Sequence, residues 1–235
     1  MLKTAITGGI GSGKSYVCNL LAERGINIYD CDAAAKRLMA TSTLLRQQLT
    51  ELIGPDTYLN NEPYAEHNMQ QLHGMKVESE RWMVDSGRWK ENRERSNEEG
   101  RRLKDEGTQQ LFVLNKAAVA QFLLASEDNA RAIDAIVHPA VAADFRHSGL
   151  QWMECAILYE SGFDSLVDRV IVVTAPEEVR LKRIMHRDSI SESKAREWIA
   201  RQWPQEEVRR RADFEIVNDG KTPLLPQIEK ILITI

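Results

Sequence analysis

Short apolar runs alternate with longer stretches of helical periodicity along most of the chain. Five of the runs are typical of strands, and they cover residues 2–7, 26–29, 150–159, 169–174 and 214–217. The run Arg-Val-Ile-Val-Val-Thr at 169–174 is the strongest strand signal, because β-branched residues dominate it. Strands that alternate with helices predict an α/β fold with a parallel sheet covered on both faces.

Helices are predicted where apolar residues recur three or four positions apart. The first predicted helix follows residue 15. The others cover 33–40, 43–53, 116–124, 129–137, 140–147, a segment after Pro176, 191–202 and a last segment from about 223. The pair His138-Pro139 is expected to separate two of these helices, since proline breaks the helical hydrogen-bond ladder. Ser191 is expected to cap its helix, and the basic residues 209–211 are expected to form a turn.

Residues 61–112 interrupt this pattern, because charged residues dominate and apolar ones are sparse over most of the stretch. The composition favours an inserted, solvated helical arm or a partly disordered segment. A partner-binding arm that uses Trp82 and Trp89 is the alternative. The predicted organisation is therefore a nucleotide-binding core at 1–60 and 148–235 with a lid at about 176–212, the charged insertion at 61–112, and a helical substrate-binding region at 113–147.

A glycine-rich stretch at 8–15 follows the first strand and fits the phosphate-binding pattern G-x-x-x-x-G-K-[ST]. Its backbone amides can converge on phosphate oxygens at the start of a helix. Lys14 would reach the β and γ phosphates, and Ser15 would offer its hydroxyl to Mg²⁺. A chance glycine-rich turn is the alternative, but the strand before and the helix after favour a nucleotide site. The residues expected to bind the nucleotide phosphates are Gly9, Ile10, Gly11, Ser12, Gly13, Lys14 and Ser15.

Two acids, Asp30 and Asp32, come directly after the second predicted strand. Ligands of parallel α/β sheets bind beyond the carboxyl ends of the strands, where this pair is expected to lie. Asp32 could instead cap the helix that follows it.

Composition limits the possible functions. The net charge of −4 over 235 residues argues against a general nucleic-acid binder, although a local basic site for an anionic substrate remains open. The three cysteines are isolated, which favours a reducing cytoplasm over a disulfide framework or a zinc site. No signal peptide and no membrane-spanning segment are expected, and a monomer or weak homo-oligomer is predicted.

The phosphate loop, the acidic pair and a late arginine-rich helical pair together resemble the dephospho-CoA kinase family. The matching segments are 7–15, Gly-Ile-Asn-Ile-Tyr-Asp-Cys-Asp at 25–32, Ile-Val-His-Pro at 136–139, Ile-Leu-Tyr-Glu at 157–160, Arg-Asp at 187–188 and Ile-Val-Asn-Asp-Gly at 216–220. The resemblance implies a three-layer P-loop kinase fold with a parallel five-stranded sheet, a helical substrate-side domain and a lid. It also implies transfer of the γ-phosphate of ATP, with Mg²⁺, to the ribose 3′-hydroxyl of dephospho-CoA.

The resemblance also implies roles for individual residues. Asp32 would be the base that orients the 3′-hydroxyl, with Asp30 supporting the site. Arg187 would close over the phosphates, with Arg183 a weaker candidate. Asn218 and Gly220 would contact the adenine, and His138 would lie on the substrate side.

Each of these residues has a simpler alternative. Helix arginines usually pair with surface acids, His138 before a proline is a common turn residue, and Asn-Asp-Gly at 218–220 is a turn signature. Glu160 could act on Mg²⁺ through water or simply accept a structural hydrogen bond.

Two positions depart from the family pattern: Tyr16 stands where the family commonly has threonine, and Cys31 where it has alanine. The competing functions are a kinase with a nucleoside, nucleotide or shikimate-type acceptor, and a nucleotide-dependent switch or scaffold that uses the charged arm. The family-like acidic and His-Pro elements speak against the first of these. The arginines of the expected lid speak against the second.

Overall fold

A computed structural model describes residues 2–59 and 112–235 of the chain. All but the last residue of the predicted charged insertion, including both of its tryptophans, lie outside the described residues. The described residues divide into two compact units, one with residues 2–32 and 144–235 and the other with residues 33–59 and 112–143. The division places 33–59 with the helical region, whereas the sequence prediction assigns them to the nucleotide-binding core.

The first unit holds a five-stranded sheet. Its strands are β1 (Thr4–Thr7), β2 (Ile28–Asp30), β5 (Trp152–Glu154), β6 (Arg169–Thr174) and β7 (Phe214–Val217). They lie in the order β2-β5-β1-β6-β7, and every neighbouring pair is parallel. The predicted parallel five-stranded sheet is thus confirmed, and β6 has the predicted bounds.

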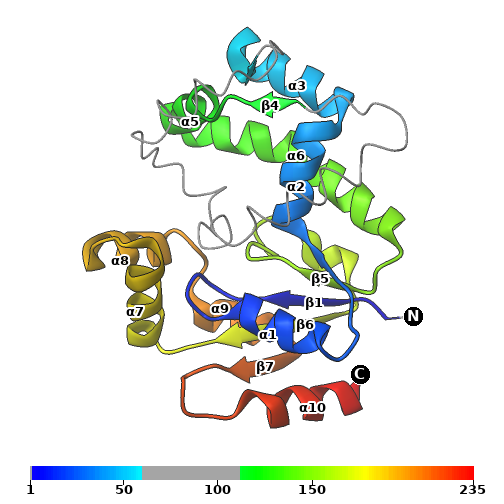
Figure 1. Cartoon of the computed structure of the whole chain (residues 1–235), viewed down its shortest axis with the longest axis vertical. Helices are drawn as coiled ribbons and strands as arrows, with labels where there is room; N and C mark the ends of the chain where they lie inside the picture. The colour runs from blue at the N-terminus through cyan, green and yellow to red at the C-terminus, as the bar shows by residue number, and fades with distance from the viewer. Residues whose placement is uncertain (1, 60–111) are drawn as a thin grey trace. The chain divides into compact units, whose positions relative to one another are not determined.

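Helices of the first unit pack on the sheet or extend beyond its carboxyl edge. They are α1 (Lys14–Ala22), α7 (Glu177–Asp188), α8 (Glu192–Ala200), α9 (Gln205–Arg211) and α10 (Leu224–Thr234). Helices α1 and α10 pack on the same face, where Val17 and Ile228 join Ile6, Ile171 and Ile216 of the strands in one buried cluster (Figure 1). This packing fixes the start of α1 against the end of β1.

Segment 205–211 is a helix, so the predicted basic turn at 209–211 is wrong. Helix α9 has Pro204 before its first residue, acids in its first turn and arginines in its last. That distribution complements the helix dipole at both ends. Ion pairs three or four residues apart, such as Glu206–Arg209 at 2.8 Å and Glu207–Arg211 at 3.1 Å, add to the helix stability.

The second unit is mainly helical. It holds most of α2 (Cys31–Thr41), α3 (Thr43–Ile53), a 3₁₀ turn (Pro55–Thr57), the short antiparallel pair β3 (Tyr58–Leu59) and β4 (Val113–Leu114), α5 (Lys116–Ala125) and most of α6 (Glu127–Ser148). Ser42 and Asn115 cap α3 and α5 by accepting hydrogen bonds from backbone amides three residues on. The Tyr58 and Phe112 rings meet edge to face with centroids 6.1 Å apart.

Helix α6 runs without a break through Pro139, so the predicted interruption at His138-Pro139 is wrong. A proline inside a helix removes one hydrogen bond and crowds the preceding turn. Here Ile133, Val137 and Val141 repeat every four residues and are each at most 2% exposed. Burial of this stripe outweighs the local cost of the proline.

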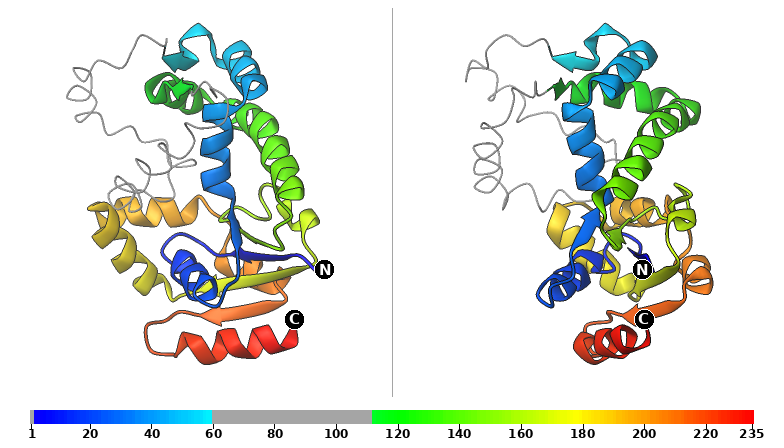
Figure 2. Two further views of the ribbon diagram at one scale, coloured as in Figure 1. Left: turned by 45° about the vertical axis from the view of Figure 1, so that its right-hand side comes forward. Right: turned by 90° about the vertical axis from the view of Figure 1, so that its right-hand side faces the viewer.

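Helices α7 and α8 form a pair beyond the carboxyl end of β1, on the side where the phosphate loop lies (Figures 1 and 2). Ser191 accepts a hydrogen bond from the Lys194 amide at 3.3 Å, which confirms its predicted cap. Both helices fall within the predicted lid, about 176–212. Across residues 2–59 and 112–235, no helix combines the length and the apolar character needed to span a bilayer.

Candidate active site

The glycine-rich stretch forms a tight loop between β1 and α1. Gly11 and Gly13 have φ of 78° and 89°, in the left-handed region that favours glycine. A Cβ on Gly13 would also stand 2.0 Å from the Asn218 Nδ2 atom, so no larger residue fits there. The loop lines a pocket together with residues of α1 and α7. The local geometry is that of an anion cradle at a helix N-terminus.

Side chains from α7 and from the turn after α8 hold the tip of this loop. Arg180 is 5% exposed, and its Nε donates to the Ile10 carbonyl oxygen at 2.9 Å. On the other side of the same residue, the Gln202 Oε1 accepts a hydrogen bond from the Ile10 amide at 2.6 Å. The amide and the carbonyl of Ile10, at the tip of the loop, are thus both hydrogen-bonded to side chains within the predicted lid.

The next part of the loop is held by Arg183 and Asn218. The Arg183 guanidinium donates to the carbonyl oxygens of Gly11 and Ser12, both at 3.2 Å, and to the Asn218 side chain at 3.2 Å. Asn218 Nδ2 donates to the Ser12 carbonyl at 2.8 Å. The amides of Ile10 and Ser12 already donate to Gln202 and to the Gly9 carbonyl. Because the Gly11 and Ser12 carbonyls point into the protein, the amides at the start of α1 can face an anion. Arg183 therefore holds the loop, a role that sequence reasoning did not foresee.

We expect the Arg180→Met variant to bind pyrophosphate about tenfold more weakly than the wild type, because a buried charged hydrogen bond to the loop is lost. Arg196→Met is the matched control, since Arg196 lies on α8, is about half exposed and pairs with Glu177 and Glu192 on the surface. Isothermal titration calorimetry with both variants gives the comparison, and thermal unfolding monitors folding. Equal affinity of Arg180→Met and the control would show that the loop needs no support from α7.

Lys14 and Ser15 both reach the end of β5. Lys14 Nζ lies 2.8 Å from Glu154 Oε1, and the Ser15 hydroxyl donates to the same oxygen at 3.1 Å. The side chains of Lys14 and Glu154 are each only 11% exposed. The structure thus brings the two predicted phosphate and Mg²⁺ ligands together on one carboxylate.

Electrostatics at this cluster favour the charged forms. Burial alone would lower the pKa of Lys14, but the charge and hydrogen bond of Glu154 and the charge of Asp32 raise it above its usual value. Burial would raise the pKa of Glu154, but Lys14 and the hydroxyl of Ser15 bring it below its usual value. The charge of Asp32 thus acts on Lys14, and the predicted catalytic role of Asp32 stays a prediction.

Asp30 is the last residue of β2 and Asp32 follows two residues later, so both lie at the carboxyl edge of the sheet. Asp30 and Glu154 are register partners in the parallel pair β2–β5. Helix α2 begins at Cys31, so Asp32 is an exposed residue of its first turn rather than the residue before the helix. Cys31 is buried, and its thiol lies against that of Cys155. The hydrogen bond with Cys155 and burial both raise the pKa of Cys31. The small cysteine fits this packed position where the family has alanine.

Glu154 was missed by sequence reasoning, which treated 150–159 as one strand that ends at Glu160. The strand ends instead at Glu154, and turns follow it. A signal was available, because an acid inside an apolar run is costly unless a cation pairs with it. Glu160 accepts a hydrogen bond from the Trp203 amide at 3.3 Å, in line with the structural alternative.

The remaining predicted residues lie in several places. Arg187 is on α7, lines the loop pocket and pairs with Asp188 at 2.8 Å. Asn218 is 8% exposed, and its side chain supports the loop, while Gly220 has φ of 81° in the turn before α10. His138 lies on α6 in the second unit, with its Nε2 3.5 Å from an Asp134 oxygen. The predicted contacts of Asn218, Gly220 and His138 with ligands stay predictions.

Within the described ranges, no cluster of three or more His, Cys, Asp or Glu side chains is arranged to hold a metal ion. Mg²⁺ in phosphoryl-transfer enzymes needs less, since it is held by one or two protein oxygens and by the substrate phosphates. The Ser15 hydroxyl and the Glu154 carboxylate, 3.1 Å apart, are hard oxygen donors of this kind. The residues present thus fit Mg²⁺.

Solved structures resemble this fold. A protein from Thermus thermophilus superposes with a TM-score of 0.68 at 23% identity, with 99% of this chain and 96% of that chain covered. The dephospho-CoA kinase from Campylobacter jejuni superposes with a TM-score of 0.54 at 17% identity, with 98% of this chain and 94% of that chain covered. At these identities the likeness concerns the fold alone.

Sequence comparisons are more specific. Dephospho-CoA kinases of Bacteroides fragilis and Porphyromonas gingivalis are each 31% identical to this chain over 242 residues. The alignments cover 98% of this chain and 91% of the first protein, and 100% of this chain and 95% of the second. The sequence model of the family described as dephospho-CoA kinase matches residues 2–71 and 90–223, and the gap lies within the predicted insertion. The chain belongs to the dephospho-CoA kinase family.

Proposed function

We propose that this protein transfers the γ-phosphoryl group of ATP to the ribose 3′-hydroxyl of dephospho-CoA, with the phosphate loop as the ATP site and Asp32 as the residue that orients the acceptor. The observation that carries this proposal is the cluster of Lys14, Ser15 and Glu154 at the mouth of the loop, with Asp32 close enough to shift the pKa of Lys14. Family membership supplies the acceptor.

Phosphoryl transfer requires alignment and compensation of charge more than covalent help from the protein. Without nucleotide, Lys14 is neutralised by Glu154. When a triphosphate enters the loop, Lys14 provides a cation for the β and γ oxygens, and the loop amides bind the phosphates. Ser15 and Glu154 would hold Mg²⁺, which when bound neutralises charge on the phosphate oxygens.

The acceptor alcohol needs a positioned carboxylate. A carboxylate is a weak base at neutral pH, so the main contribution of Asp32 is to orient the 3′-hydroxyl towards the γ-phosphorus and accept its proton late. Asp32 lies in the first turn of α2, on the same sheet edge as Lys14 and Glu154. Arg187 lines the pocket from α7, and we assign it to the diffuse charge of the phosphates.

Further parts of the proposal rest on the sequence. The isolated cysteines favour the cytoplasm, where thiols stay reduced. The net charge of −4 argues against a nucleic-acid partner. We propose ATP and dephospho-CoA as the substrates, no membrane partner, and a monomer or weak homo-oligomer.

The test is to incubate the purified protein with Mg-ATP and one acceptor at a time and to follow ADP. Dephospho-CoA, adenosine, shikimate and buffer alone are the four conditions. We expect rapid ADP formation with dephospho-CoA and only slow background formation in the other three. Equal ADP formation in buffer alone would support a nucleotide switch, and a preference for adenosine or shikimate would identify a different kinase.

A further inference from the structure

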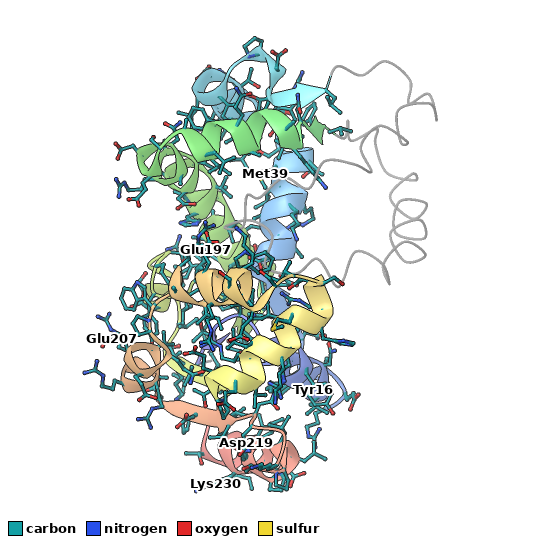
Figure 3. The ribbon with its side chains drawn as sticks, turned by 90° about the vertical axis from the view of Figure 1, so that its left-hand side faces the viewer. Tyr16, Met39, Glu197, Glu207, Asp219 and Lys230 are labelled. Carbon is teal, nitrogen blue, oxygen red and sulfur yellow. The ribbon has the colours of Figure 1, made fainter. Side chains whose placement is uncertain are left out.

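Tyr16 is an aromatic residue whose place in the site is not explained by the reaction. It is the third residue of α1, directly after Lys14 and Ser15, and its side chain is 58% exposed. Among the described residues its side chain has no hydrogen-bond partner. Figure 3 shows Tyr16 with α7 beside it, and both contribute to the wall of the loop pocket. Exposing an aromatic ring to water at the rim of a ligand pocket is unfavourable, and a planar ligand that stacks on the ring would remove this cost.

The direction of a bound nucleotide follows from the loop. Lys14, on the side of Glu154 and Asp32, marks the end where the γ-phosphate reacts. The α-phosphate and the nucleoside must therefore leave the cradle on a different side. The pocket offers such a side, because Tyr16 lines it together with Arg183, Ile184 and Arg187 of α7.

The chemistry of these walls suits a nucleobase. Tyr16 offers an aromatic ring that can stack on a base. Arg183 also donates to Asn218, which ties the turn at 218–220 to the same part of the loop. The family resemblance predicts the adenine contact at that turn.

We propose that Tyr16 is a further ATP-binding residue that packs its ring on the adenine. The inference rests on the proposed ATP site and adds to it a residue that stacks on the base. A smaller residue at this position would leave the phosphate contacts intact, because these come from the loop amides, Lys14 and Ser15. Tyr16 therefore acts on the nucleoside part of the ligand alone.

The test compares two ligands, ADP and pyrophosphate, by isothermal titration calorimetry with the full chain. Tyr16→Ala is expected to weaken ADP binding about tenfold, the usual effect of losing one base-stacking ring, and to leave pyrophosphate binding unchanged. Tyr16→Phe keeps the ring and is expected to bind ADP like the wild type. Ile233→Ala on α10, another highly exposed apolar residue, is the control for general surface effects.

Three results would overturn the inference. Unchanged ADP binding in Tyr16→Ala would show that the ring does not touch the nucleoside. An equal loss for ADP and pyrophosphate would mean that Tyr16 acts on the shape of the loop. Loss of ADP affinity in Tyr16→Phe would assign the contact to the hydroxyl. Failure of the proposed ATP site has a different signature, because the wild type itself would then bind neither ligand. Failure of the proposed acceptor would leave ADP binding intact and would show only in the assay of ADP formation with dephospho-CoA.

Discussion

Replacing Lys14 with methionine is expected to lower kcat/KM for ATP by a factor of about 100 to 1000. The substitution keeps the length of the side chain but removes the cation that would face the transferring phosphoryl group. Loss of one such electrostatic contact typically costs that much in rate. ADP formation with dephospho-CoA as acceptor measures the effect.

The same substitution also leaves Glu154 buried without a cation. Breaking a buried pair from one side typically costs about 3–5 kcal/mol of stability, so the melting temperature of Lys14→Met is expected to fall. The double variant Lys14→Met/Glu154→Gln removes the unpaired charge and should recover most of the stability but none of the activity. Normal turnover in Lys14→Met would contradict the assignment of residues 8–15 as the phosphate loop. A folded but inactive double variant would show that the loss of activity does not come from loss of folding.

Asp32→Asn is expected to lower kcat by a factor of about 100 to 1000, within the range for a positioned acid or base. Asparagine has nearly the same shape, but it cannot accept the proton of the 3′-hydroxyl and carries no charge. The Kd for ADP should change less than twofold, because the loop holds the phosphates. Steady-state kinetics with dephospho-CoA and calorimetry with ADP give the two values.

Asp56→Asn is the matched control, because Asp56 is also an exposed first-turn acid, in the 3₁₀ turn Pro55–Thr57. It should leave both kcat and nucleotide affinity unchanged. Near-normal kcat in Asp32→Asn would transfer the acceptor role to another acid, and Asp30 would then be the first to test.

The sheet could be predicted from sequence because its strands are short, apolar and separated by helices. At β6 the β-branched run gives the bounds as well, whereas β5 is shorter than its apolar run. The run from 150 to 159 holds a charged residue, Glu154, at which the strand ends, and the cation that pairs with it lies on α1. Local pattern contains no information about a cation 140 positions away.

The same limit applies to the supports of the loop. Arg180, Arg183 and Gln202 lie on a segment whose sequence suggests only an amphipathic helical pair. Their contacts with Ile10, Gly11 and Ser12 depend on how α7 and α8 fold back beside β1. Pro139 is the opposite case, because a strong local signal was overridden by burial along α6.

The arrangement of Asp32 opposite the phosphate loop is most directly tested by a crystal structure with Mg²⁺, a non-hydrolysable ATP analogue and dephospho-CoA. We expect an Asp32 carboxylate oxygen within about 2.6–3.2 Å of the ribose 3′-hydroxyl, with that hydroxyl facing the γ-phosphorus above Lys14. A complex in which the 3′-hydroxyl is bound by a different group, with Asp32 turned away from it, would contradict this account.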